Sequence, residues 1–220
     1  MDSVAVRHKM VQALAKDGVT DTVVLQAFAS VERHRFVDSA LVNQAYEDTS
    51  LPIGLGQTIS KPGVVARMLA LLRAGPGTPL SGKLGRVLEI GTGCGYQAAL
   101  LSHLATEVYS IERLRGLNDK ARDNLRPFRI PNIHLLLGDG MLGYAAGAPY
   151  AGIIVAAGGD QVPQAWLDQL ALRGRLVCPV ARPGGKPGEQ ALLVIDKTSA
   201  GYQQHVLEPV LFVPLKSGVS

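Results

Sequence analysis

The sequence contains few of the residues on which several protein classes depend. Its 220 residues include two cysteines, Cys94 and Cys178, which lie far apart in different predicted elements. They give neither a metal-ligand spacing nor a disulfide framework. We therefore predict no metal site, and we expect two reduced thiols in a cytoplasmic protein.

Long apolar runs are also missing. No stretch approaches the roughly 18 consecutive apolar residues that a membrane-spanning helix requires. The first residues, Met1-Asp2-Ser3, do not begin a secretory signal with a basic and then an apolar region. Internal repeats and low-complexity segments are absent as well. These features predict a protein without a membrane partner.

Charge of one sign is not concentrated anywhere along the chain. Lys and Arg number 22 and Asp and Glu number 18, for a net charge of +4, and the basic residues are scattered. A nucleic-acid interface usually gathers them on one face, so we expect no specific nucleic-acid partner. Hydrophobic residues make up 47% of the chain, which is enough for a full core.

The first 80 residues have helical patterns. Apolar spacing predicts a helix from Val4 to Lys16, and Asp21 can cap another that runs to about Val31. The run "GVVARMLALLRAG" predicts a third, with Pro62 near its first turn and Gly75 just after its end. No alternating pattern precedes residue 80. We therefore predict a helical cap over residues 1–80, which also includes the segment that the resemblance described below marks as a substrate lid.

From Arg86 onward, strands and helices alternate. Nearly continuous apolar strands separated by helices are typical of a parallel sheet covered on both faces. The predicted strands are Arg86–Ile90, Val108–Ile111, Ile133–Leu137, Ile153–Ala156 and Leu176–Val180, and the predicted helices are Tyr96–Leu104, Leu114–Leu125 and Pro163–Leu172.

The C-terminal part has a different pattern. "QALLVIDK" and "HVLEPVLFVPL" are extended runs with no helix between them, and Gly201 lies in the short connection. They predict an antiparallel pair at one edge of the sheet. We expect an α/β core over residues 81–220 that forms one compact domain with the cap.

A glycine-rich turn follows the first strand of this core. The strand runs into Gly91, Thr92, Gly93, Cys94 and Gly95, and a helix begins at once. Glycines let the backbone approach a ligand closely, and a helix N-terminus offers free N–H groups. The G-x-G-x-G spacing departs from the G-x-G-x-x-G of dinucleotide-binding proteins, so a nucleotide phosphate is less favoured.

Carboxylates follow at successive strand ends. Glu112 ends the second strand and could accept both hydroxyls of a ribose, while Asp139 and Gly140 end the third strand where a base would lie. Glu89 precedes the first glycine by two residues. Carboxylates favour a cationic ligand without phosphates, which indicates S-adenosyl-L-methionine. Taken alone, Glu112 could equally be a solvated strand-end carboxylate.

At this point the chain resembles the protein-L-isoaspartate O-methyltransferases. The matching pieces follow the order of that family over about residues 40–215, and "GQTIS" is the most specific of them. One departure is Arg173, where the family often has glycine. The pieces are "YEDTSLPIGLGQTISKP", "VLEIGTGCGYQAALLSHL", "VYSIE", "LLLGDG", "VPQAWLDQL", "GRLVCPV" and "FVPL".

The resemblance implies a Rossmann-like methyltransferase fold with a mostly parallel seven-stranded sheet. It also implies methyl transfer from S-adenosyl-L-methionine to the free carboxyl of L-isoaspartyl residues in damaged proteins and peptides, with S-adenosyl-L-homocysteine as product. In such a protein "TIS" is part of a substrate lid. Ser60 would be the catalytic hydroxyl, and Thr58 and Ile59 would bind substrate.

Other interpretations remain open from the residues. Ser60 could merely cap the helix that begins near Pro62. The glycine turn and the carboxylates would also suit a methyltransferase for a small molecule or RNA, which does not need "GQTIS". A regulatory module that binds the adenosyl group without turnover would carry the same turn.

Overall fold

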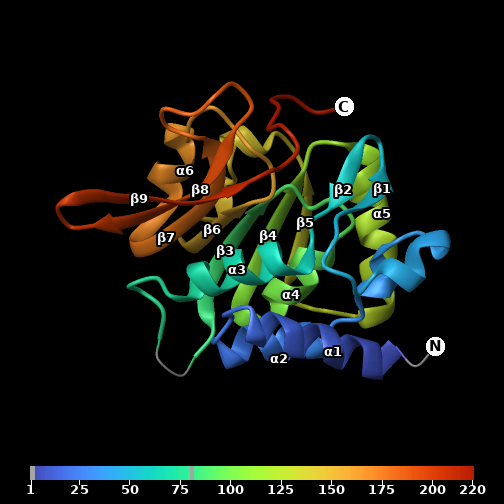
Figure 1. Ribbon diagram of the computed structural model, residues 1–220. Helices are drawn as coiled ribbons and strands as arrows, with labels where there is room; N and C mark the ends of the chain where they lie inside the picture. The colour runs from blue at the N-terminus through green and yellow to red at the C-terminus, as the bar shows by residue number, and fades with distance from the viewer. Residues whose placement is uncertain (1–2, 80–81) are drawn as a thin grey trace.

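The computed structural model describes residues 3–79 and 82–220. Helices pack on both faces of a central sheet (Figure 1). The helices are α1 (Ser3–Lys16), α2 (Thr22–Ser30), α3 (Pro62–Arg73), α4 (Tyr96–Leu104), α5 (Arg115–Leu125) and α6 (Gln164–Gln169), with short 3-10 helices η1 (Arg33–Phe36), η2 (Ser39–Gln44), η3 (Arg126–Phe128), η4 (Gly140–Leu142) and η5 (Ala145–Gly147).

The strands form a small hairpin and a large sheet. Within the described residues the large sheet has seven strands in the order β5-β4-β3-β6-β7-β8-β9. Strands β5, β4, β3, β6 and β7 run parallel to one another. Strands β8 and β9 form the predicted antiparallel pair at one edge, and β8 is also antiparallel to β7. The strands are β1 (Leu51–Gly54), β2 (Gln57–Ile59), β3 (Leu84–Ile90), β4 (Ala105–Glu112), β5 (Ile133–Leu137), β6 (Tyr150–Val155), β7 (Leu170–Ala181), β8 (Gln190–Thr198) and β9 (Gly201–Val210).

The central strands of the sheet are buried on both faces, which explains why they are almost continuously apolar. Along β3, Val87 packs with the cluster of side chains that includes α1 to α4, and its neighbour Leu88 packs with the cluster that includes Trp166 of α6. Successive strand residues point to opposite faces. The apolar run therefore fills two cores at once.

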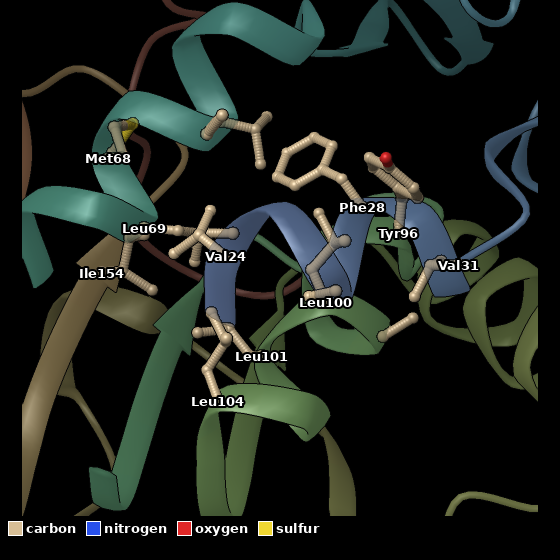
Figure 2. Close-up of a cluster of buried hydrophobic side chains, with 14 of the residues drawn as sticks. Val24, Phe28, Val31, Met68, Leu69, Tyr96, Leu100, Leu101, Leu104 and Ile154 are labelled. Atoms are coloured by element: carbon tan, nitrogen blue, oxygen red, sulfur yellow. The ribbon is translucent and has the colours of Figure 1, made fainter. Parts of the chain in front are cut away.

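The N-terminal helices cover one face through α3 and α4. Val24 and Phe28 of α2 lie against Leu100 and Leu101 of α4 and against Leu69 of α3 (Figure 2). All of these side chains are fully buried. The cap and the α/β core therefore share one apolar cluster.

Local signals set the helix ends much as predicted. Asp21 precedes α2, and its Oδ1 accepts hydrogen bonds from the amides of Val23 at 2.9 Å and Val24 at 3.1 Å. Its Oδ2 pairs with Nε of Arg73 at 2.8 Å, which fastens α2 to the end of α3. One carboxylate thus caps a helix and positions it.

Residues 1–80, predicted as a helical cap with a substrate-lid segment, also contain two short strands. Leu51–Gly54 and Gln57–Ile59 pair as an antiparallel hairpin. Strands this short show no clear alternation, and Gly54, Leu55 and Gly56 turn with positive φ angles of 98°, 53° and 70°. The proposed boundary between cap and core falls at residues 80–81, outside the described residues.

The helix predicted over Pro163–Leu172 is shorter than expected. It covers Gln164–Gln169, and β7 begins directly at Leu170. The predicted C-terminal strand was also too long, because β9 ends at Val210 and "FVPL" leaves the sheet. Instead, the amide of Leu215 donates to the carbonyl of Gly158 at 2.7 Å.

Figure 1 places the hairpin, in cyan, at the end of the sheet where the C-terminal segment, in red, also lies. The carboxyl ends of the parallel strands meet at this end. In open α/β sheets ligands bind in the crevice outside these strand ends, so a ligand site is expected here.

No helix among the described residues has the length and apolarity needed to cross a membrane.

Arg173 gives a test of the backbone at the start of β7. The register between β6 and β7 shifts here, and Arg173 has a φ of 65°, a left-handed conformation that favours glycine. We expect Arg173→Gly to raise the free energy of unfolding by about 0.5–1 kcal/mol, measured by urea denaturation. Ala171→Gly, at a neighbour without a positive φ, should lower it. A loss of stability in Arg173→Gly would contradict the assignment of strain to this residue.

Candidate active site

A cavity of about 310 Å³ lies at the carboxyl end of the sheet. Its walls come from the glycine turn, the ends of β4 and β6, the β1–β2 hairpin and the C-terminal segment. The residues that line it include Ile53, Leu55, Gln57, Thr58, Ile59, Ser60, Gly91, Thr92, Gly93, Cys94, Tyr96, Glu112, Gly140, Ala156 and residues 213–216. Most of the predicted site residues therefore meet in one place.

The glycine turn forms one wall because its backbone takes positive φ angles. Gly91, Gly93 and Gly95 have φ of 92°, 57° and 91°. A Cβ on Gly93 would come within 3.2 Å of Cδ1 of Ile53 in the hairpin, so a side chain there would crowd the space between turn and lid. Gly95 instead packs on α5, where a Cβ would lie 3.1 Å from Cδ1 of Leu125.

Glu112 links the ends of β3 and β4. Its Oε2 accepts a hydrogen bond from the amide of Gly93 at 2.9 Å, and its Oε1 accepts one from the amide of Leu114 at 3.0 Å. A carboxylate has about four acceptor positions, so two backbone bonds leave room for ribose hydroxyls. The side chain is held in place and still lines the cavity.

Glu89 does not line this cavity. It is fully buried under the turn and accepts a hydrogen bond from the Ser110 hydroxyl, which in turn contacts the Thr92 hydroxyl at 2.6 Å. Burial raises the pKa of the Glu89 carboxyl from its ordinary 4.5 to about 8. At neutral pH this group is protonated, so its position and charge do not favour the predicted direct contact with a cationic cofactor.

Asp139 and Gly140 are adjacent in sequence but have different structural roles. Gly140 lines the cavity, and a Cβ there would meet Cγ2 of Ile90 at 2.5 Å, so glycine is needed. Asp139 is not among the described residues that line the cavity. Its carboxylate accepts from the amide of Met141 at 2.9 Å and from that of Gly218 at 2.7 Å. Asp139 therefore holds the C-terminal segment beside the cavity.

The hairpin and the residue that follows it form a lid over the cavity and carry the predicted hydroxyls. Thr58 and Ser60 line both this cavity and an adjoining hollow of about 440 Å³, and Ile59 is buried between them. Ser60 does not cap α3: the N-cap is Lys61, and Oδ1 of Asp48 accepts from the Gly63 amide at 2.6 Å. The capping interpretation of Ser60 was therefore wrong.

Other titratable groups near the turn are unsuited to nucleophilic or acid–base work. Burial raises the pKa of the Cys94 thiol to about 11, so it stays protonated. No histidine in the described part of the chain lines the cavity. The wall also includes Gln57, Gln97, Arg113 and Lys216 beside Glu112, hydroxyls, backbone and apolar side chains, which suits binding and orientation.

Sequence reasoning missed the C-terminal wall. Val213, Pro214, Leu215 and Lys216 line the cavity, and the amide of Gly158 donates to the Val213 carbonyl at 2.8 Å. The signal was present, since "FVPL" belongs to the matching pieces. An extended segment that leaves a sheet has no pattern of its own that would assign it to a site.

The residues fit S-adenosyl-L-methionine. The volume lies at the lower end of ordinary small-molecule pockets, which span about 300–1,000 Å³. A turn that needs glycine lets a ligand approach the backbone, and Glu112 offers ribose acceptors. No cluster of His, Cys, Asp or Glu among the described residues could hold a metal ion.

The raised pKa of Glu89 predicts a pH dependence. In the unfolded chain this carboxyl ionises near pH 4.5, but in the folded chain it keeps its proton up to about pH 8. Its contribution to stability is therefore fully present below pH 4.5 and is lost as the pH rises to about 8. Glu89→Gln, which is neutral throughout, should gain stability relative to the parent between about pH 5 and 8, measured by urea denaturation.

The exposed Glu47→Gln is the matched control and should show no such pH-dependent gain. If Glu89→Gln and the parent lose stability in parallel between about pH 5 and 8, the proton does not reside on Glu89.

Comparison with known proteins agrees with this geometry. The profile of the family described as protein-L-isoaspartate(D-aspartate) O-methyltransferase (PCMT) matches residues 5–220. A protein-L-isoaspartate O-methyltransferase from Leptothrix cholodnii is 58% identical over 100% of this chain and 76% of its own length. One from Methylibium petroleiphilum is 57% identical over 99% of this chain and 80% of its own length.

Solved structures agree with the fold. A protein-L-isoaspartate O-methyltransferase chain superposes with a TM-score of 0.84 at 28% identity, over 97% of this chain and 67% of that one. A Plasmodium falciparum structure that contains S-adenosyl-L-homocysteine gives a TM-score of 0.76 at 23% identity, over 94% of this chain and 97% of that one, which supports the fold alone.

The cavity, its glycine turn and its hydroxyl-bearing lid thus occur in a chain whose whole length matches one family. The chain belongs to the protein-L-isoaspartate(D-aspartate) O-methyltransferase family, enzymes that use S-adenosyl-L-methionine to methylate the free carboxyl of isoaspartyl residues.

Proposed function

We propose that this chain carries out the reaction of its family in the cavity under the β1–β2 lid, with Ser60 as the hydroxyl that orients the substrate carboxylate. The observation that carries the proposal is the meeting of Ser60 with the glycine turn and Glu112 around one space. The substrates are L-isoaspartyl residues in damaged proteins and peptides.

The chemistry makes modest demands on the protein. A carboxyl with a pKa of about 4 is already ionised at neutral pH, so no general base is required. When bound, S-adenosyl-L-methionine supplies an electrophilic methyl group. The protein has to hold the carboxylate in line, at about 3 Å, in a space that excludes water. A hydroxyl that donates one hydrogen bond orients a carboxylate without protonating it.

Different residues around the cavity would bind the cofactor and support the turn. Gly91, Thr92, Gly93 and Cys94 would hold the cofactor through the backbone, and Glu112 would accept its ribose hydroxyls. Gly95 keeps the turn against α5, and Gly140 gives room at the end of β5. Glu89 and Asp139 act indirectly, through the buried hydroxyl chain and the C-terminal segment.

The adjoining hollow would take the rest of the substrate. An isoaspartyl residue lies within a polypeptide, so the chain has to leave the cavity on the side of the lid. Thr58, Ser60, Ala156 and Val213 line both spaces, so the two spaces adjoin at these residues. Thr58 and Ile59 would thus contact the substrate beside Ser60.

The cap of residues 1–80 and the core of residues 81–220 would act as one unit. The lid belongs to the first part and the glycine turn to the second, and the cavity requires both. A truncated chain that lacks the cap would have an open turn and no Ser60.

We further propose a cytoplasmic protein with no specific nucleic-acid partner and no membrane partner. The scattered basic residues favour this, as does the pairing of several of them with acidic neighbours. Arg67 with Glu208 and Lys120 with Asp38 are examples, with N–O distances of 2.6 and 2.9 Å.

The first experiment compares acceptors with labelled S-adenosyl-L-methionine. We expect transfer to an isoaspartyl peptide and none to the matched aspartyl peptide or to RNA. Label on RNA, with binding that falls steeply as salt is added, would favour the RNA enzyme. Binding of the cofactor without transfer to any acceptor would favour the regulatory module.

Glu112 tests the cofactor half of the site. Glu112→Ala should weaken the binding of S-adenosyl-L-homocysteine by about 1–3 kcal/mol, because a charged acceptor is lost. Gly93→Val should weaken binding more, because a side chain would fill the space next to Ile53. Calorimetry measures both. Glu107→Ala on the same strand is the control and should leave the affinity unchanged. An unchanged affinity in Glu112→Ala would show that Glu112 does not bind the ribose hydroxyls.

Ser60 tests the substrate half. Ser60→Ala should lower the rate of peptide methylation by about 10- to 1000-fold while leaving the affinity for S-adenosyl-L-homocysteine nearly intact, because one orienting bond is lost. Steady-state kinetics and calorimetry on the same variant measure the two effects. A variant that methylates at the parent rate would end the catalytic role of Ser60.

A further inference from the structure

We propose that Arg33 is a positioning residue for methyl transfer, which acts by fixing the backbone of Ser60. Arg33 lies in η1, is fully buried and does not line the cavity. It therefore has no direct part in binding or chemistry. The inference depends on the role proposed above for Ser60.

The hydrogen bonds of Arg33 all go to the segment that carries the lid. Its Nε donates to the carbonyl of Ala45 at 2.7 Å, and its Nη2 donates to that of Ser60 at 2.9 Å. A longer contact of 3.5 Å joins Nη2 to the carbonyl of Thr49. Ala45 and Thr49 precede the β1–β2 hairpin and Ser60 follows it, so one guanidinium fastens both ends of the lid.

The same side chain reaches the cofactor half of the site. The guanidinium carbon of Arg33 lies 4.9 Å from the ring centroid of Tyr96, the first residue of α4. Tyr96 follows Gly95 directly and lines the cavity. Its ring is held in turn by edge contacts with Phe28 and Phe36, at centroid distances of 6.2 and 5.5 Å. Arg33 thus connects the lid to the element that bears the glycine turn.

The buried positive charge of Arg33 indicates a role other than packing. Burial of a cation without a paired carboxylate is costly. The guanidinium donates to backbone carbonyls, and the Tyr96 hydroxyl and the Asp48 carboxylate add favourable electrostatic interactions. Its Nη1 has no hydrogen-bond partner among the described residues. An apolar side chain would fill this position at lower cost, but it could not hold the Ser60 carbonyl.

The fork of the guanidinium explains the residue type. Nε and Nη2 donate in different directions from one rigid plane, so the carbonyls of Ala45 and Ser60 are held at a fixed separation. The single ammonium of lysine cannot reproduce this arrangement. Arg33→Lys therefore keeps a long basic side chain with a donor and removes the fork geometry, and it is the informative variant.

The experiment is a double-mutant cycle between Arg33→Lys and Ser60→Ala. It measures kcat and KM for an isoaspartyl peptide at saturating S-adenosyl-L-methionine, well below the melting temperature of each variant. A displacement of about 1 Å can cost on the order of 100-fold in rate, so we expect Arg33→Lys to lower kcat by about 10- to 100-fold. The affinity for S-adenosyl-L-homocysteine should change by less than about 3-fold, because Glu112 and the glycines are intact.

In the Ser60→Ala background, Arg33→Lys should lower kcat by less than about 3-fold, because the hydroxyl that Arg33 would position is already absent. An equal loss in both backgrounds would overturn the proposal. So would a parent kcat in Arg33→Lys with only a lower melting temperature. If the lysine variant does not fold, Arg33→Gln, which keeps one donor and removes the charge, completes the same cycle.

Arg73→Met is the matched control. Arg73 is also a buried arginine, but it pairs with Asp21 at 2.8 Å, at the end of α3 away from the lid. This variant should melt at a lower temperature and methylate at the parent rate. A parent rate in Ser60→Ala would overturn the role of Ser60 itself, whereas an impaired Ser60→Ala beside a fully active Arg33→Lys would overturn only the positioning by Arg33.

Discussion

The hydrogen bond between the Gly93 amide and the Glu112 carboxylate joins the ends of two neighbouring strands, and the site is built around it. It is 2.9 Å long and fixes a glycine turn against the acidic end of β4. The turn can approach Glu112 because Gly93 has a positive φ. The carboxylate is thereby held at the edge of the cavity with acceptor positions left over.

The lid depends on long-range contacts more than on its own sequence. Its strands are short, and an isolated two-stranded hairpin is at best marginally stable in water. Here it is held by the buried Ile53 and Ile59, by Arg33 at the Ser60 carbonyl, and by Lys120, whose Nζ donates to the Ile53 carbonyl at 2.9 Å. Contacts from η1 and α5 thus decide where the Ser60 hydroxyl lies.

Electrostatics separates two carboxyls that look alike in the sequence. Glu89 and Glu112 both lie at the carboxyl end of a parallel strand. Glu89 points into the interior, where burial keeps it protonated, whereas Glu112 is held by backbone amides beside the cavity. The neutral Glu89 and the hydroxyls of Ser110 and Thr92 give the turn a rigid polar support without adding a second negative charge close to Glu112.

The sequence by itself determined the parallel sheet, its antiparallel edge, the cap of α2 by Asp21 and the glycine turn before α4. These features depend on local signals: apolar period, capping chemistry and the freedom of glycine. It also predicted that Ser60, Glu112 and Gly140 belong to one site, because strand ends converge at one edge and "GQTIS" marked the lid. The tertiary structure alone decided that Glu89 is buried and that Asp139 holds Gly218. It also decided that residues 213–216 close the cavity and that Arg33 reaches Ser60 across the fold. These outcomes depend on which distant side chains packing brings together, and a linear pattern carries no information on such distances.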